Sequence, residues 1–95
     1  MNEKSVSPQD GEALIILAEE CAEVIKCVTK ILRHGYRPTH SNIRYDNVSD
    51  LEAELGDVRA AMIRACSLGI VNLDAIHDRV LAKREQIKPY LHYPD

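Results

Sequence analysis

The sequence predicts an all-α protein, and three observations support that prediction. Apolar residues recur at intervals of three and four over residues 8–34, 49–68 and 73–88, the spacing of amphipathic helices. Capping residues, glycines and a proline mark the ends of these segments. The chain has 95 residues, enough for one domain but short for a self-sufficient core. We therefore expect a single domain over 1–95 whose three helices complete a helical bundle by homo-oligomerisation.

The first helix is expected at about 8–34, after a flexible tail at 1–6. Ser7 is placed to cap it, Pro8 suits its first position, and Gly35 is a helix stop. Glu20, Glu23 and Lys30 flank its apolar seam. The residues of this seam step by three and four along the segment: Leu14, Leu17, Cys21, Val24, Val28 and Ile31.

The second helix is expected at about 49–68, opened by a capping box of Ser49 and Glu52 and closed by Gly69. Glu54 lies about 60° to one side of the apolar stripe at 100° per residue, and Asp57 lies further round. The stripe comprises Leu51, Leu55, Val58, Met62, Ala65 and Cys66. Between these two helices, residues 35–48 form a long polar loop, the kind of segment that tends to be functional or disordered.

The third helix is expected at about 73–88, capped by Asn72 and stopped by Pro89. Its second half is basic, and part of that charge complements the helix dipole. The basic residues are Arg79, Lys83, Arg84 and Lys88.

Composition limits the class of protein. The net charge of −3 and the isoelectric point near 5.8 argue against nucleic acid as a partner. The apolar runs are too short to span a membrane, and residues 1–5 lack the apolar core of a signal peptide. The three cysteines form no CxxC pair, so we interpret them as small buried hydrophobes in a reducing compartment. These features predict a cytoplasmic protein without a membrane partner.

Two carboxylate pairs point to the chemistry. Glu20 and Glu23 form one pair and Glu54 and Asp57 the other, each spaced by three and therefore adjacent on a helix surface. Solvated acidic faces are common, but Glu20 and Glu54 border apolar seams, where an unpaired charge is costly. If the two helices pack antiparallel, the pairs meet and need a cation or a proton. Oxygen ligands favour Mg²⁺, with Mn²⁺ as an alternative, and the absence of Glu-x-x-His among these residues disfavours a di-iron site.

The double motif also carries a resemblance. The segments LAEECAEVIK and LEAELGDVRAAM contain an EExxE and an ExxD motif, and over about residues 12–88 the chain resembles the MazG-like all-α nucleoside triphosphate pyrophosphohydrolases. The resemblance implies Mg²⁺-dependent hydrolysis between the α and β phosphates, giving a nucleoside monophosphate and pyrophosphate, in a dimer or tetramer. It implies that Glu20, Glu23, Glu54 and Asp57 bind the metal. One of Glu19, Glu20, Glu23 or Glu54 then activates the water.

Basic residues are the expected phosphate contacts: Lys26, Lys30, Arg33, Arg37 and Lys83. The 35–48 loop is expected over the substrate side, where its histidine, tyrosine, arginine and asparagine side chains can contact a base. Two alternatives stay open. One is a phosphoribosyl-ATP or dUTP/dCTP pyrophosphatase of the same superfamily. The other is a non-enzymatic helical dimerisation or interaction module whose acidic strips are only surface.

Overall fold

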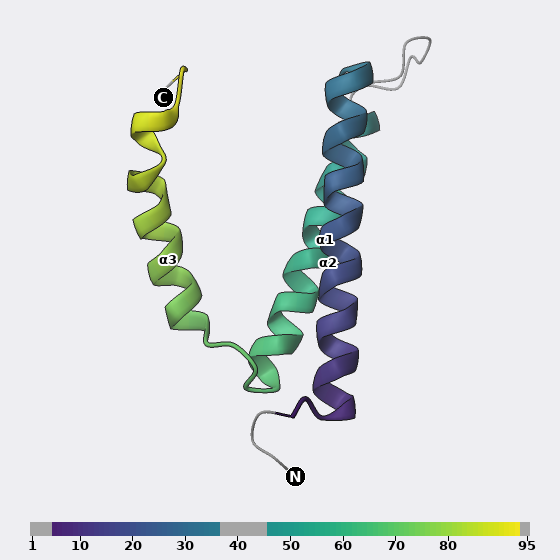
Figure 1. The fold of residues 1–95 in the computed structure, drawn as a ribbon. Helices are drawn as coiled ribbons and strands as arrows, with labels where there is room; N and C mark the ends of the chain where they lie inside the picture. The colour runs from purple at the N-terminus through teal and green to yellow at the C-terminus, as the bar shows by residue number, and fades with distance from the viewer. Residues whose placement is uncertain (1–4, 37–45, 94–95) are drawn as a thin grey trace.

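The computed structural model describes residues 5–36 and 46–93 and has three α-helices (Figure 1). These are α1 (Pro8–His34), α2 (Asp46–Ser67) and α3 (Leu73–Gln86), followed by a short 3₁₀ turn, η1 (Lys88–Tyr90). The described residues contain no strand. The all-α prediction is confirmed, whereas residues 1–4 of the expected tail and residues 37–45 of the expected loop lie outside the described residues.

Most predicted helix ends are confirmed. The Ser7 hydroxyl accepts a hydrogen bond of 3.1 Å from the backbone N–H of Asp10, and the Asn72 side chain accepts one of 2.9 Å from Ala75. Gly35 follows α1 and Gly69 lies just after α2, with φ angles of 85° and 75°. Backbone in this left-handed region favours glycine, which explains why these helices stop where they do.

The predicted start of the second helix is wrong. α2 begins at Asp46, so Ser49 lies inside the helix and is not its N-cap. The reason is a contact that local sequence does not reveal. The backbone N–H of Asn47 donates to the Tyr36 carbonyl (3.0 Å), and its side-chain Nδ2 donates to the Gly35 carbonyl (2.9 Å). Asn47 is 2% exposed, and its Oδ1 has no hydrogen-bond partner among the described residues. Through its two donated bonds this residue joins the first turn of α2 to the end of α1.

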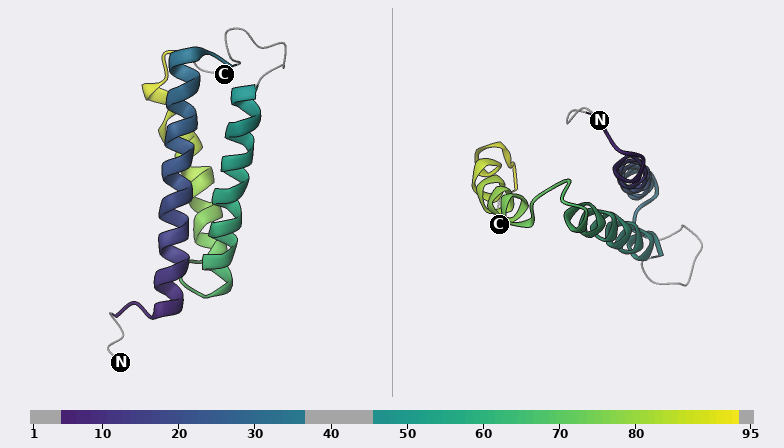
Figure 2. Two further views of the ribbon diagram at one scale, coloured as in Figure 1. Left: turned by 90° about the vertical axis from the view of Figure 1, so that its right-hand side faces the viewer. Right: turned by 90° about the horizontal axis from the view of Figure 1, so that it is seen from below.

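α1 and α2 form an antiparallel hairpin, and α3 stands apart from it (Figures 1 and 2). The separation of α3 is plain in Figure 1 and in the view from below in the right panel of Figure 2. The radius of gyration is 17.1 Å, whereas a compact chain of this length has about 12 Å. The hairpin is therefore the packed part of the chain, and α3 presents its apolar positions to solvent.

The seam of α1 differs from the predicted one. The face that α2 covers carries Ala13, Leu17, Glu20, Val24, Cys27 and Ile31, again in steps of three and four. Three of the predicted seam residues, Leu14, Cys21 and Val28, are exposed. They belong to a second apolar face, about 90° around the helix at 100° per residue. The prediction merged these two faces, and its burial of Cys21 was wrong.

The seam of α2 shows the same shift. Its covered face carries Asn47, Leu51, Glu54, Val58, Ala61 and Ala65, so Glu54 lies within the seam and Leu55 is exposed. The buried apolar residues of the described chain are all alanines: Ala13, Ala61 and Ala65. Small side chains let the two helices approach closely. None of the described helices combines the length and the apolar character needed to cross a bilayer.

Candidate active site

Three carboxylates meet in the middle of the α1–α2 hairpin. Glu20 comes from α1, and Glu54 and Asp57 come from α2; one oxygen of each lies within 4.8 Å of one oxygen of each of the others. Glu54 and Asp57 are neighbours because residues three apart share a helix face. Glu20 faces them because it lies in the covered seam of α1 and the two helices run antiparallel. We call Glu20, Glu54 and Asp57 the carboxylate cluster.

The cluster perturbs the acidity of its central member. The pKa of Glu54 is raised, first by burial, and then by the negative charge of Asp57, Glu23 and Glu20. Burial disfavours the charged form, and neighbouring like charges disfavour it further. A cation placed among the three oxygens would stabilise their charged forms and lower the pKa of Glu54 again. The arrangement therefore suits either a shared proton or a bound metal ion.

The donor set fits a hard divalent cation. All three ligand atoms are carboxylate oxygens, the type that Mg²⁺ and Mn²⁺ prefer. Mg²⁺ commonly binds one or two protein carboxylates plus water and substrate phosphates, so three carboxylates leave positions for a substrate. Glu23 is outside the 4.8 Å group but close enough to act on the charge of Glu54.

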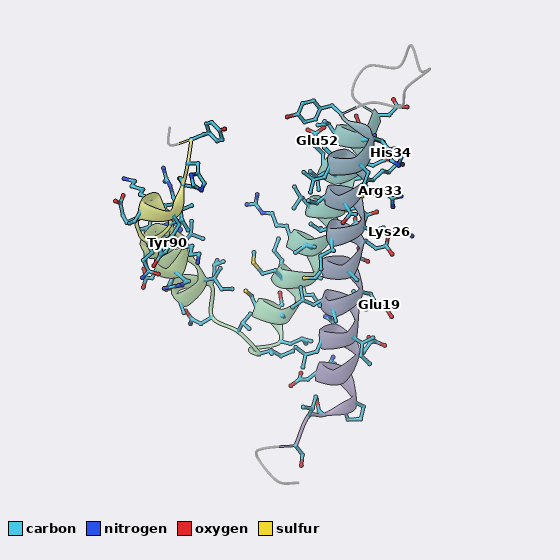
Figure 3. The ribbon with its side chains drawn as sticks, turned by 45° about the horizontal axis from the view of Figure 1, so that its top comes forward. Glu19, Lys26, Arg33, His34, Glu52 and Tyr90 are labelled. Carbon is cyan, nitrogen blue, oxygen red and sulfur yellow. The ribbon has the colours of Figure 1, made fainter. Side chains whose placement is uncertain are left out.

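Several predicted site residues lie elsewhere on α1. Glu19, Lys26 and Arg33 are spaced by seven, so they form one stripe, and Figure 3 shows this stripe pointing away from α2. They are not brought to the carboxylate cluster within this chain. Lys30 does face α2: its Nζ lies 3.7 Å from an oxygen of Asp50, in a pair whose side chains are both more than half exposed. Such exposed pairs contribute little to stability.

Two predicted phosphate contacts remain, Arg37 and Lys83. Arg37 lies outside the described residues. Lys83 lies on α3, which stands apart from the helices that carry the cluster (Figure 1). Within one chain, α3 therefore does not bring its basic side chains to the carboxylates.

A shallow pocket of about 380 Å³ adjoins the cluster and is lined by residues of both hairpin helices. Its lining residues are Ile16, Glu20, Asp57, Ala60, Ala61 and Arg64. The sequence interpretation missed Arg64, as well as Asp50, the partner of Lys30. Helical spacing could have indicated both residues, because Arg64 follows Asp57 by seven positions and Asp50 precedes Glu54 by four, which places each on the same helix face as a cluster residue.

Cys27 is a further neighbour of the site. The pKa of its thiol is raised, first by burial and then by the charges of Glu54 and Asp50, with Lys30 acting in the opposite direction. A raised pKa keeps the thiol protonated and weakly nucleophilic at neutral pH. Cys27 therefore acts as a half-buried seam residue beside the carboxylates and not as an activated nucleophile.

We compared the chain with known protein families. The profile of the MazG nucleotide pyrophosphohydrolase domain matches residues 9–92, which is nearly the whole chain. The chain belongs to this family. The match includes both hairpin helices and α3, and it confirms the resemblance drawn from the EExxE and ExxD motifs. Neither a curated protein nor a solved structure gave a significant match.

Membership gives the general chemistry. MazG domains hydrolyse nucleotides and typically depend on a divalent metal, and the carboxylate cluster of this chain has the ligands for one. The same membership is consistent with a nucleotide substrate.

Proposed function

We propose that this protein is a Mg²⁺-dependent nucleoside triphosphate pyrophosphohydrolase that cleaves between the α and β phosphates of ribo- or deoxynucleoside triphosphates. The products are a nucleoside monophosphate and pyrophosphate. The observation that carries the proposal is the carboxylate cluster, in which α1 and α2 bring three oxygen ligands within 4.8 Å in a MazG domain.

Glu20, Glu54 and Asp57 hold the metal in this proposal. When bound, the metal neutralises phosphate oxygens and lowers the pKa of a coordinated water. The chain's own carboxylates do the rest. Glu23 lies one turn from Glu20 on the same helix, so it either completes the metal site or accepts the proton of the attacking water. Glu23→Gln separates these roles: loss of metal binding supports the first, and loss of turnover with metal binding retained supports the second.

Self-association is part of the proposal. The second apolar face of α1 is uncovered, with Leu32 81% and Ile25 66% exposed, and the apolar side of α3 is uncovered as well. A dimer or tetramer would bury these faces. It would also allow α3 of a second copy to bring its basic side chains, including Lys83, near the carboxylate cluster. The cytoplasmic location stays a prediction.

The uncovered faces equally favour the alternative of a non-enzymatic interaction module. Metal response separates the two. An enzyme gains thermal stability with millimolar Mg²⁺ and gains more with a non-hydrolysable triphosphate, because ligands that bind only the folded state stabilise it. A module whose acidic residues are only surface does not respond.

The decisive test is a panel of ribo- and deoxynucleoside triphosphates with Mg²⁺, scored for release of pyrophosphate and monophosphate. The panel includes dUTP, dCTP and phosphoribosyl-ATP to separate the related activities. Glu54→Gln and Asp57→Asn should abolish turnover. The matched control is Glu52→Gln, on the same helix but outside the cluster (Figure 3). If both cluster variants hydrolyse nucleotides at the wild-type rate, with helical content unchanged, the proposal is wrong.

A further inference from the structure

The pocket beside the carboxylate cluster has a cation at its far end. Its volume of about 380 Å³ lies within the range of about 300–1,000 Å³ that is usual for small-molecule sites. Glu20 and Asp57 of the cluster form one end, and Arg64 is the cation among the lining residues. Metal ligands and a guanidinium therefore share one concave surface.

The spacing along α2 places these groups on one face. Asp57 and Arg64 are seven residues apart, so they differ by only about 20° around the helix and lie about 10 Å apart along its axis. Ala60 and Ala61 lie between them, and their small side chains leave space in the pocket between Asp57 and Arg64. Among the described residues, Arg64 forms no salt bridge, and its side chain is exposed. The guanidinium is therefore available to an anion that approaches the cluster.

The lining chemistry selects the kind of anion. The guanidinium of arginine presents a planar fork of donors that matches phosphate oxygens in a bidentate pair. The lining residues include no aromatic ring and no amide side chain, so the guanidinium of Arg64 is the group that meets an incoming ligand at this position. Its positive charge favours an anionic phosphate over a neutral nucleobase.

We propose that Arg64 binds the β- and γ-phosphates of the substrate, and afterwards the pyrophosphate product, on the α2 side of the carboxylate cluster. This assignment rests on the proposed function. The nucleoside half of the substrate then extends toward the opposite end of the hairpin. A simpler role for Arg64 is to complement the dipole at the C-terminal end of α2. That role changes helix stability and leaves ligand affinity untouched.

Calorimetric titration of the full-length protein with inorganic pyrophosphate in saturating Mg²⁺ tests the assignment. Arg64→Ala should raise the Kd for pyrophosphate roughly 10- to 100-fold, the range expected for a lost charge-assisted hydrogen bond. Arg64→Lys should restore part of the affinity. The matched control is Arg59→Ala, an exposed arginine about 140° around α2 from Arg64. It should bind pyrophosphate as the wild type does, and nucleoside monophosphate affinity should stay within about twofold in every variant.

Three results overturn the assignment: unchanged pyrophosphate affinity in Arg64→Ala, an equal loss of pyrophosphate and monophosphate affinity, or no pyrophosphate binding by the wild type. If Arg64→Ala does not fold, Arg64→Gln and Arg64→Lys decide by the same criteria. The nucleotide panel is a separate measurement. Wild-type protein that binds pyrophosphate through Arg64 but hydrolyses no nucleotide would contradict the proposed activity and leave the Arg64 site standing.

Discussion

Ala65 tests whether close helix approach holds the carboxylate cluster together. Its side chain is fully buried, at 0% exposure, in the alanine-rich half of the α1–α2 seam. Ala65→Leu adds three carbon atoms where no space remains for them. Overpacking of this kind costs about 1–3 kcal/mol. A domain of this size loses about 4–8 °C in Tm for each kcal/mol, so the Tm should fall by roughly 5–20 °C.

Thermal melts followed by circular dichroism measure this effect. They are run at one fixed protein concentration, because the proposed self-association would make Tm depend on concentration. The matched control is Ala53→Leu, which adds the same atoms at an exposed position of the same helix and should leave Tm nearly unchanged. The larger side chain in Ala65→Leu should also reduce the increase in Tm that Mg²⁺ produces, because the spacing of the two helices also sets the distances between the carboxylates of the cluster. If Ala65→Leu melts with the wild type, the close seam is not where we place it.

Four further outcomes follow from the same geometry. Metal-free wild type should lose stability as pH rises through the raised, folded-state pKa of Glu54, because the folded state binds that proton more tightly than the unfolded state. Glu54→Gln should remove both this dependence of stability on pH and the Mg²⁺-dependent increase in Tm, as measured by thermal melts from acid to neutral pH. Cys27 should alkylate more slowly than the exposed Cys21 at neutral pH, because its thiol pKa is raised, and mass spectrometry of the labelled peptides measures the two rates. Leu32→Lys should shift light scattering toward a smaller species while helical content is retained, because it puts a charge on the uncovered face of α1. Asn47→Ala should lower the free energy of unfolding, measured with denaturant, by about 1 kcal/mol, because the hydrogen bond from Nδ2 to the Gly35 carbonyl is lost. A variant as stable as the wild type would show that this bond does not hold the end of the hairpin.

The helices and most of their ends were predictable because their signals are local. Ser7 and Asn72 cap the helices that follow them, and Gly35 and Gly69 supply the left-handed backbone after α1 and α2. Each of these features depends on a few neighbouring residues. The start of α2 was not predictable in this way, because Asn47 bonds to the end of α1 across a gap of twelve residues.

Three of the four carboxylates predicted as metal ligands meet in the carboxylate cluster, Glu23 lies outside it, and the placement of the cluster within the seam was not predicted. The spacing of Glu54 and Asp57 marks them as neighbours, and the hairpin adds Glu20. α1 has apolar residues on two faces, and periodicity alone does not reveal which face a neighbouring helix covers. The structure selects the face that contains Glu20. The carboxylates that were expected on the shoulders of the seams therefore lie inside them.

With the proposed metal bound at the carboxylate cluster, this placement would couple metal binding to the fold. Glu20 and Glu54 interrupt a mainly apolar and alanine-rich contact between α1 and α2. Without a cation their repulsion works against helix pairing, whereas an ion bound to both helices holds them together. Linkage requires reciprocity: a ligand that favours the paired helices is itself bound more tightly when the helices are paired. A substitution that loosens the seam should therefore weaken metal binding even where it touches no ligand. Metal affinity becomes a readout of helix packing as well as of the carboxylates themselves.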